Sequence, residues 1–334
     1  MGKNEAIVIA ALVAIAVVTV LIPTMHAATP TGLSGELTVA GSTTVLPINQ
    51  ECARLLMEAN PDLRISISGG GSGHGVKSVG AGEIDIGAAS RDVKAAEMEQ
   101  YPDLKPVAIG KDSVAIVLHP SNPVNELTLE QVAKIFSGEI TNWKDVGGTD
   151  AAIRVLTREE GSGTREVFET YVMTPFDKEV AGAASVKSSN GEVRATVSSD
   201  SRSIGYLSLG YVDSSIKTVT IDGVEPTVEN VHSGVYPISR NLYLITKGEP
   251  SALEQTFIDF VLSSEGQEVV EDVGYLRVVS PAAPTTPTPA PTKSPAPSAT
   301  PLTTPTPEEP GFEAVCAIAG LLAVASLVLK RKHD

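Results

Sequence analysis

Three short segments of the chain carry Gly, Ser and Thr residues where a predicted strand passes into a predicted helix. They are residues 40–44 (AGSTT), 69–75 (GGGSGHG) and 158–164 (REEGSGT). The first residues of a helix present N–H groups without intrahelical partners and a partial positive charge. Glycine lets the backbone approach a ligand closely, and Ser and Thr add hydroxyl donors. If the three turns converge, they enclose one tetrahedral oxyanion in hydrogen-bond donors.

Each turn also has a simpler interpretation. Ser and Thr are favoured helix N-caps, so any one of these segments is explained by capping alone. Three turns of one design, with a basic residue at the head of the third, are harder to explain in that way. The sequence therefore favours an oxyanion site built from helix N-termini.

Arg158 is the basic residue of the third segment and stands four residues before Ser162. Its planar guanidinium can give two parallel N–H donors to anionic oxygens. The alternative is a surface ion pair with Glu159 or Glu160. Both alternatives stay open at the level of sequence.

Ser90 and Arg91 form a further candidate pair. They follow the predicted strand at residues 84–88, and open α/β sheets bind ligands at the carboxyl ends of their strands. Arg91 is predicted either as a second charge partner of the anion or as the partner of Asp92.

Enzyme chemistry finds little support in the sequence. Residues 70–78 resemble a P-loop, but Val76 separates the Gly from the Lys that a P-loop keeps adjacent. The Gly-x-Ser-x-Gly elbow of serine hydrolases is missing, and His74 within the Gly-rich turn is unsupported as a general base. Neither zinc-ligand spacing nor an EF-hand-like loop occurs. We therefore expect no catalysis, no metal and no cofactor.

The body of the chain, about residues 34–280, alternates short apolar strands with helical patterns. This alternation predicts an α/β fold with mostly parallel strands. Thr128 and Gln131 form a capping box at the start of one helix, and Pro47 lies in the first turn of another. Predicted strands lie at 37–40, 63–68, 84–88, within 107–118, and at 153–156, 216–221 and 242–246; predicted helices lie at 47–59, 75–80, 128–136, 164–172, 193–198 and 253–262.

The two ends have other compositions. Residues 1–28 contain one Lys, an apolar run and small residues before Ala28, which predicts a secretory signal peptide. A retained transmembrane helix is the alternative. Residues 281–310 are rich in Pro, Thr, Ala and Ser, which predicts an extended linker. Residues 311–334 hold an apolar stretch and a basic end, which predicts a membrane segment.

Charge and cysteine content narrow the function further. The formal net charge of −15 argues against nucleic acid as a partner. It does not argue against a buried anion, because local N–H groups and dipoles hold such an ion. The two cysteines, Cys52 and Cys316, lie in the body and in the tail, so we expect no structural disulfide. Cys52 is predicted to be a small buried residue on a helix.

Five motifs, in this order and spacing, resemble those of the PstS-type phosphate-binding proteins: AGSTTVLP, GGGSGHGVK, DIGAASRD, IFSGEITNW and LTREEGSGT. The similarity spans about residues 36–280. It implies an α/β, two-lobed periplasmic-binding-protein-like (type II) fold with a hinge between lobes that close on phosphate. On this plan the first lobe takes residues 34–115 plus 240–280, and the second takes residues 116–239.

The same resemblance implies a set of phosphate ligands. They are Ser42, Thr43 and Thr44 from the first turn, Ser72 and Gly73 from the second, and Arg158, Ser162, Gly163 and Thr164 from the other lobe, with Ser90 and Arg91 as further candidates. One position departs from the family. Several relatives place an aspartate where Ser90 stands, and that aspartate accepts the ligand's proton and helps to reject sulfate. The nearest carboxylates here are Asp85 and Asp92.

The resemblance further implies that the protein, as a monomer, hands phosphate to the permease subunits of an ABC importer. Pro310, Gly311 and Phe312, followed by an apolar stretch and a basic end, resemble the PGF-type sorting signals of archaeal surface proteins. This tail predicts an extracellular protein anchored to the cell membrane. The alternatives are a receptor for sulfate, molybdate or tungstate and a structural cell-surface protein.

Overall fold

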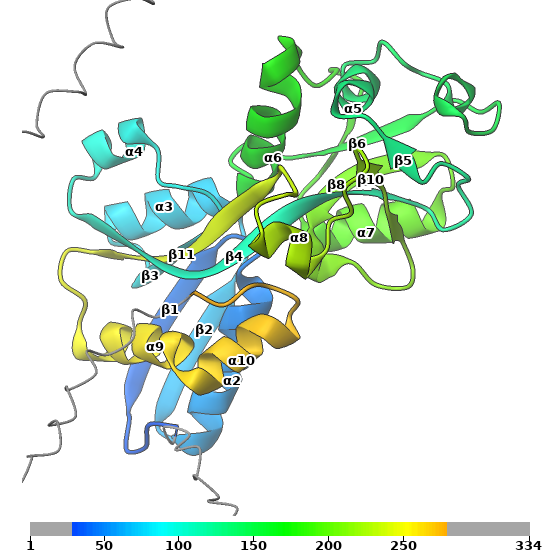
Figure 1. Cartoon of the computed structure of the whole chain (residues 1–334). Helices are drawn as coiled ribbons and strands as arrows, with labels where there is room; N and C mark the ends of the chain where they lie inside the picture. Colours follow the sequence, from blue (N-terminus) through cyan, green and yellow to red (C-terminus); the bar gives the residue numbers. More distant parts are fainter. Residues whose placement is uncertain (1–28, 279–334) are drawn as a thin grey trace, which may run out of the picture. The chain divides into compact units, whose positions relative to one another are not determined.

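The computed structural model describes residues 29–278, and the predicted leader, linker and C-terminal segment lie outside the described residues (Figure 1). The strands are β1 Gly35–Gly41, β2 Leu63–Ser68, β3 Ile86–Ala89, β4 Leu104–Leu118, β5 Glu126–Leu127, β6 Arg154–Arg158, β7 Ser185–Lys187, β8 Ser203–Ser208, β9 Lys217–Thr218, β10 Thr220–Ile221 and β11 Ser239–Lys247. The α-helices are α2 Leu46–Ala59, α3 Ser72–Ala81, α4 Ala95–Gln100, α5 Leu129–Phe136, α6 Gly163–Phe168, α7 Asn190–Ser199, α8 Val228–His232, α9 Ala252–Leu262 and α10 Ser264–Asp272.

One sheet of nine strands runs through the described part of the chain in the order β2-β1-β3-β11-β4-β8-β6-β7, with β9 paired to β4. At one end β1 pairs in parallel with β2 and β3, and at the other end β6 pairs in parallel with β7 and β8. Each parallel group is a strand–helix–strand arrangement, as the alternating sequence pattern predicts. The predicted α/β class is therefore confirmed.

The centre of the sheet differs from the prediction of mostly parallel strands. β4 and β11 are antiparallel to each other, with Ser113 opposite Ser239 and Leu104 opposite Lys247. β11 is also antiparallel to β3, and β4 to β8. Figure 1 shows the two long strands crossing the middle of the molecule between two groups of helices. The prediction was wrong here because β4 leaves the first group and β11 returns to it, so they must run in opposite directions.

Two hydrophobic clusters lie along these crossing strands. The first contains Ile109 of β4 and Leu242 of β11, packed with α2 and α9. The second contains Val114 of β4 and Ile238, packed with α5 and α6. The strands therefore pass from one apolar core to another within a few residues. This arrangement is that of a two-lobed protein with two crossing segments between its lobes.

Most predicted helix starts are found in the structure. Thr128 caps α5, accepting a hydrogen bond at its side chain from the Gln131 N–H at 3.1 Å, and the Gln131 side chain accepts one from the Thr128 N–H at 2.8 Å. Pro47 lies in the first turn of α2, as predicted. The predicted helix at 164–172 continues beyond α6 as a π-helix, Glu169–Met173. The single strand predicted at 216–221 is divided into β9 and β10, which pair with different partners.

Within residues 29–278, none of the helices combines the length and the apolar character that crossing a membrane requires. The predicted membrane segment at 311–334 lies outside this range, so its prediction stays untested by the fold.

The prediction that Cys52 is a buried helix residue is confirmed. Cys52 lies on α2 and is 0% exposed. Burial, with smaller contributions from the charges of Glu51 and Glu265, raises the pKa of its thiol to about 12. The thiolate is the reactive form, so little of it exists at neutral pH.

We therefore expect Cys52 to resist iodoacetamide in the folded protein at pH 8 and to react completely in denaturant. Mass spectrometry of the peptide that contains Cys52 separates its modification from that of Cys316. Rapid labelling of Cys52 without denaturant would contradict the buried position.

Candidate anion-binding site

The three Gly, Ser and Thr turns come together between the two cores. The Gly73 N–H donates to the Gly161 carbonyl at 2.9 Å, and the hydroxyl oxygens of Thr44 and Thr164 lie 3.3 Å apart. The predicted ligands Ser42, Thr43, Thr44, Ser72, Gly73, Ser90, Arg91, Arg158, Ser162, Gly163 and Thr164 are all buried. The three turns therefore lie together, as the sequence predicts, and the assignment of these residues as ligands stays a prediction.

Close packing at this point requires glycine. A Cβ atom added to Gly163 would lie 2.4 Å from the Ser72 hydroxyl oxygen and 2.7 Å from that of Ser90. A Cβ on Gly41 would lie 2.2 Å from the Ala88 carbonyl oxygen, and Gly41 also has φ +138°. Glycine at these positions lets the backbones of facing turns approach each other.

Each turn presents hydrogen-bond donors. Gly163 and Thr164 open α6, so their N–H groups precede the first intrahelical bond, and the Ser162 hydroxyl caps the next N–H at 3.3 Å. In the first turn the Leu46 N–H already donates to the Ser42 carbonyl at 3.1 Å, so helical bonding begins at Ser42. Capping and anion binding are thus compatible, because capping uses only part of the N–H groups at each start.

Arg158 connects the third turn to the first. Its side chain is 1% exposed, and its Nη2 donates to the Thr43 hydroxyl at 3.3 Å. Its Nε and Nη2 also donate to the two carboxylate oxygens of Glu159 at 2.9 and 2.8 Å. The predicted pair with Glu159 therefore occurs, although it lies largely inside the protein and not on its surface, and the binding of an anion by Arg158 stays a prediction. A buried guanidinium needs such partners, since a desolvated charge without them is costly.

Ser90 lies against the second turn. Its N–H donates to the Ser72 hydroxyl at 3.0 Å, and the two hydroxyl oxygens are 3.4 Å apart. The structure therefore places Ser90 with the predicted ligands of the first lobe.

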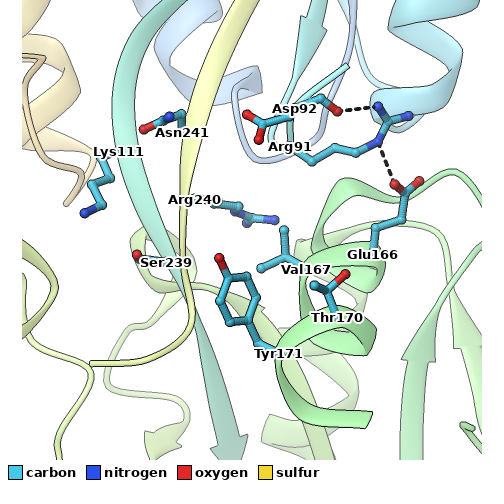
Figure 2. Close-up of a pocket in the computed structure, with 10 residues that line it drawn as sticks. All are labelled: Arg91, Asp92, Lys111, Glu166, Val167, Thr170, Tyr171, Ser239, Arg240 and Asn241. Atoms are coloured by element: carbon cyan, nitrogen blue, oxygen red, sulfur yellow. Dashed lines mark hydrogen bonds and ion pairs between the residues drawn. The ribbon is translucent and has the colours of Figure 1, made fainter. Parts of the chain in front are cut away.

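Arg91 is held by carboxylates and not by the turns. Its Nη1 and Nη2 donate to Glu97 at 2.7 and 2.8 Å. Its Nε pairs with Glu166 at 2.9 Å, as Figure 2 shows. Burial opposes the charge, but these two carboxylates raise the pKa of Arg91. Arg91 contacts its other predicted partner, Asp92, only at the backbone carbonyl, which accepts from Nη1 at 2.8 Å. Lys94 also pairs with Glu166 at 2.9 Å, so this cluster joins α4 and α6.

Sequence reasoning missed the pair formed by Asp112 of β4 and Arg240 of β11. Nε and Nη2 of Arg240 donate to the same oxygen of Asp112 at 2.9 and 2.7 Å. Nη1 and Nη2 also donate to the hydroxyls of Thr164 and Thr44, at 2.9 and 3.1 Å. Burial raises the pKa of Asp112, against the lowering effect of Arg240. A carboxylate inside a predicted apolar strand was the signal, because such a residue needs a buried partner.

Asn190, at the start of α7, was also missed. Its Oδ1 accepts from the Ser208 N–H and from Nη1 of Arg158, both at 3.2 Å. Its Nδ2 therefore points the other way and donates to the hydroxyls of Thr43 and Thr44 at 3.3 and 3.0 Å. Nothing in the sequence near Asn190 distinguishes it from an ordinary residue that follows a helix cap.

Two tyrosines hold the backbone of the first turn. Tyr211 donates to the Thr43 carbonyl at 2.6 Å, and Tyr275 donates to the Thr44 carbonyl at 2.9 Å. Burial raises the pKa of Tyr211 to about 12 and raises that of Tyr275 well above its ordinary value, so both remain protonated donors. The carbonyl groups of Thr43 and Thr44 are thereby engaged, while the N–H groups of Ser42 and Thr44 donate to the Ala88 carbonyl at 2.8 Å and to the Ser42 hydroxyl at 3.2 Å.

The two carboxylates named as substitutes for the family aspartate make other contacts. Asp85 accepts from the N–H and the hydroxyl of Thr38, both at 2.7 Å, in an exposed position. Asp92 accepts from the Tyr243 hydroxyl at 2.6 Å. Among the side chains of residues 29–278, no group of three or more His, Cys, Asp or Glu is placed to hold a metal ion.

Comparisons with known proteins identify a superfamily domain and a C-terminal motif in this chain. Residues 26–265 match the model of the PBP superfamily domain, and residues 309–332 match the PGF-CTERM motif. The motif confirms the predicted sorting signal and identifies an extracellular protein anchored to the membrane.

Relatives of known sequence and structure point to one family. The phosphate-binding protein PstS of Bacillus subtilis is 35% identical over 73% of this chain and 81% of its own, and that of Borreliella burgdorferi is 34% identical over 72% and 90%. A Clostridium perfringens structure described as a phosphate ABC transporter substrate-binding protein with bound phosphate is 38% identical, covers 73% of this chain and 100% of its own, and has a TM-score of 0.69. A phosphate transport receptor from Vibrio cholerae is 31% identical over 73% of this chain and 100% of its own, with a TM-score of 0.60. The chain therefore belongs to the PstS family of phosphate-binding proteins.

Proposed function

We propose that this protein captures inorganic phosphate between its lobes and delivers it to the permease subunits of an ABC importer. The observation that carries the proposal is the meeting of three helix N-termini with the buried Arg158. Donor-rich backbone and a guanidinium match the oxygens of a phosphate group. The names of the relatives, as phosphate-binding proteins and transport receptors, support the same ligand.

The proposed lobes follow the crossing strands. We assign residues 34–115 plus 240–280 to the first lobe and residues 116–239 to the second. In the proposed mechanism the first lobe holds phosphate on Ser42, Thr43, Thr44 and Ser72. Closure then adds Arg158 and the N-terminus of α6. The ligand favours the closed form only through these added contacts.

The closed lobes would also strengthen each contact to the anion. Electrostatic interactions are screened less inside a protein than in water, so burial makes each charge-assisted bond stronger. We propose that the closed protein, acting as a monomer, is the form that docks on the permease. The membrane anchor keeps it close to that partner.

Arg158→Ala should weaken phosphate binding about 10- to 100-fold, because a charge-assisted bond is worth about 1.5–3 kcal/mol. Isothermal titration calorimetry measures the effect. Arg154→Ala is the matched control, since Arg154 lies on the same strand with 59% of its side chain exposed and pairs with Asp200. Equal affinities of the Arg158 variant and the control would refute the assignment of Arg158.

Thr164→Val should cost about 1–3 kcal/mol of binding free energy, because it removes a buried hydroxyl donor while keeping the shape of the side chain. Thr164→Ser keeps the donor and should bind phosphate within about threefold of the natural protein, a difference of less than about 1 kcal/mol. The same calorimetric titration compares the two. Equal losses in both variants would point to a packing role for Thr164.

Glu166→Gln should speed phosphate release. Glu166 on α6 pairs with Arg91 and Lys94 of the first lobe, both at 2.9 Å, so it stabilises the closed form. We expect the dissociation rate to rise about fivefold, the equivalent of about 1 kcal/mol for a partly exposed pair. Stopped-flow measurement separates this rate from association. Glu169→Gln is the control, because Glu169 pairs with Arg165 of its own lobe. Similar dissociation rates in both variants would show that the pairing of Glu166 with Arg91 and Lys94 does not slow phosphate release.

A further inference from the structure

The pair of Arg240 and Asp112 lies where the crossing strands meet the anion site, and Arg240 touches two predicted ligands. Arginine has N–H donors only and no acceptor. The hydroxyl oxygens of Thr164 and Thr44, at 2.9 and 3.1 Å from the guanidinium, must therefore accept these bonds. Asp112 fixes the guanidinium in this orientation through two bonds to one carboxylate oxygen.

Asn190 imposes the same direction on the first turn. Its amide cannot flip, because Oδ1 accepts from a backbone N–H and from an arginine. Nδ2 must therefore donate to Thr43 and Thr44. The hydroxyl oxygen of Thr44 thus receives two donors, from Asn190 and from Arg240.

The direction of these bonds decides what the hydroxyls can offer a ligand. A hydroxyl has one proton and two lone pairs, so an oxygen that already accepts two hydrogen bonds can only donate further. The hydroxyl oxygen of Thr43 accepts from Arg158 and Asn190, and that of Thr44 accepts from Asn190 and Arg240. Both hydroxyls are therefore donors, and Thr44 donates its proton to Thr164 or to the ligand. Hydroxyls that can only donate match a ligand oxygen that carries lone pairs and no proton.

Each carboxylate beside the site is paired with an arginine, and Oδ1 of Asp112 is a buried oxygen without a hydrogen-bond partner among the described residues. Glu159 is held by Arg158, Asp112 by Arg240, and Glu97 and Glu166 by Arg91. Ser90 stands where several relatives place an aspartate, so the position offers a hydroxyl in place of an ionised acceptor for a ligand proton.

We propose that Arg240, oriented by Asp112, is a positioning residue that makes the site select oxyanions by their unprotonated oxygens. The inference rests on the proposed phosphate-binding function and specifies its ligand class as tetrahedral oxyanions recognised through acceptor oxygens. Sulfate, which carries no proton at neutral pH, therefore competes with phosphate, and phosphate binds better as it loses protons.

Other charged groups also face Arg240. It lines a cavity of about 440 Å³ together with Arg91, Asp92, Lys111 and Glu166 (Figure 2). Asp112, whose pKa burial raises, is the titratable carboxylate bonded directly to Arg240. Phosphate exchanges a proton near neutral pH whereas sulfate does not, so the affinity for sulfate reports any change in the protein alone.

The test uses Asp112→Asn together with Arg240→Gln. Changing both residues avoids leaving one buried charge without its partner. Glutamine can present either end of its amide, so the hydroxyls of Thr44 and Thr164 become free to accept a ligand proton. The control is Asp200→Asn with Arg154→Gln, which neutralises a pair at 2.9 Å whose arginine is exposed. Calorimetry with phosphate and with sulfate, at pH 6 and pH 8, gives the dissociation constants.

We expect the ratio of sulfate affinity to phosphate affinity at pH 6 to fall at least tenfold in the Asp112 and Arg240 variant and to stay unchanged in the control. In a background of Thr44→Val and Thr164→Val the same change should leave the ratio within twofold, because Arg240 acts through these hydroxyls. A ratio that does not move, or that moves equally without the hydroxyls, overturns the proposal.

The natural protein provides a second test that does not depend on how the variants fold. Its phosphate affinity should rise at least fivefold from pH 6 to pH 8 while its sulfate affinity stays level. A phosphate affinity that is flat or falls with pH overturns the positioning role but leaves the receptor function intact. Failure to bind either anion overturns the proposed function itself, and the inference with it.

Discussion

The structure depends on one constraint: a guanidinium removed from water must have all of its charge and donors matched by acceptors. Arg91, Arg158 and Arg240 are each buried to within a few per cent at the junction of the two lobes. Each is paired with at least one carboxylate, and each also contacts an element of the opposite lobe or of the anion site. The arginines thereby connect the elements that meet at this junction.

The crossing strands explain why these charges meet. β4 and β11 are antiparallel neighbours, so Asp112 of one lies opposite Arg240 of the other in the strand register. On either side of this point the same strands enter the two apolar cores. A polar pair at the boundary between two cores is satisfied without interrupting either of them. It also places the donors of Arg240 beside Thr44 of the first turn and Thr164 of the third.

Hydrogen-bond direction adds a second level of organisation. Residues with donors alone, such as arginine, and residues locked by a backbone N–H, such as Asn190, leave no freedom to the hydroxyls that they contact. Tyr211 and Tyr275 do the same for the carbonyl groups of the first turn. The surroundings of the turns thus decide whether a threonine acts as a donor or as an acceptor. The threonines themselves permit both.

The sequence by itself determined the α/β class, the three donor-rich turns, the place of Arg158 beside them, and the buried state of Cys52, because each follows from periodicity, glycine content or local composition. It did not determine the antiparallel centre of the sheet, the engagement of Arg91 by Glu97 and Glu166, or the presence of Asp112, Arg240 and Asn190 in the site. Those features join residues up to 196 positions apart, as in the contact of Thr44 with Arg240. Only the tertiary structure decided them, since the partner of a buried polar group is chosen by where the chain returns and not by its neighbours in sequence.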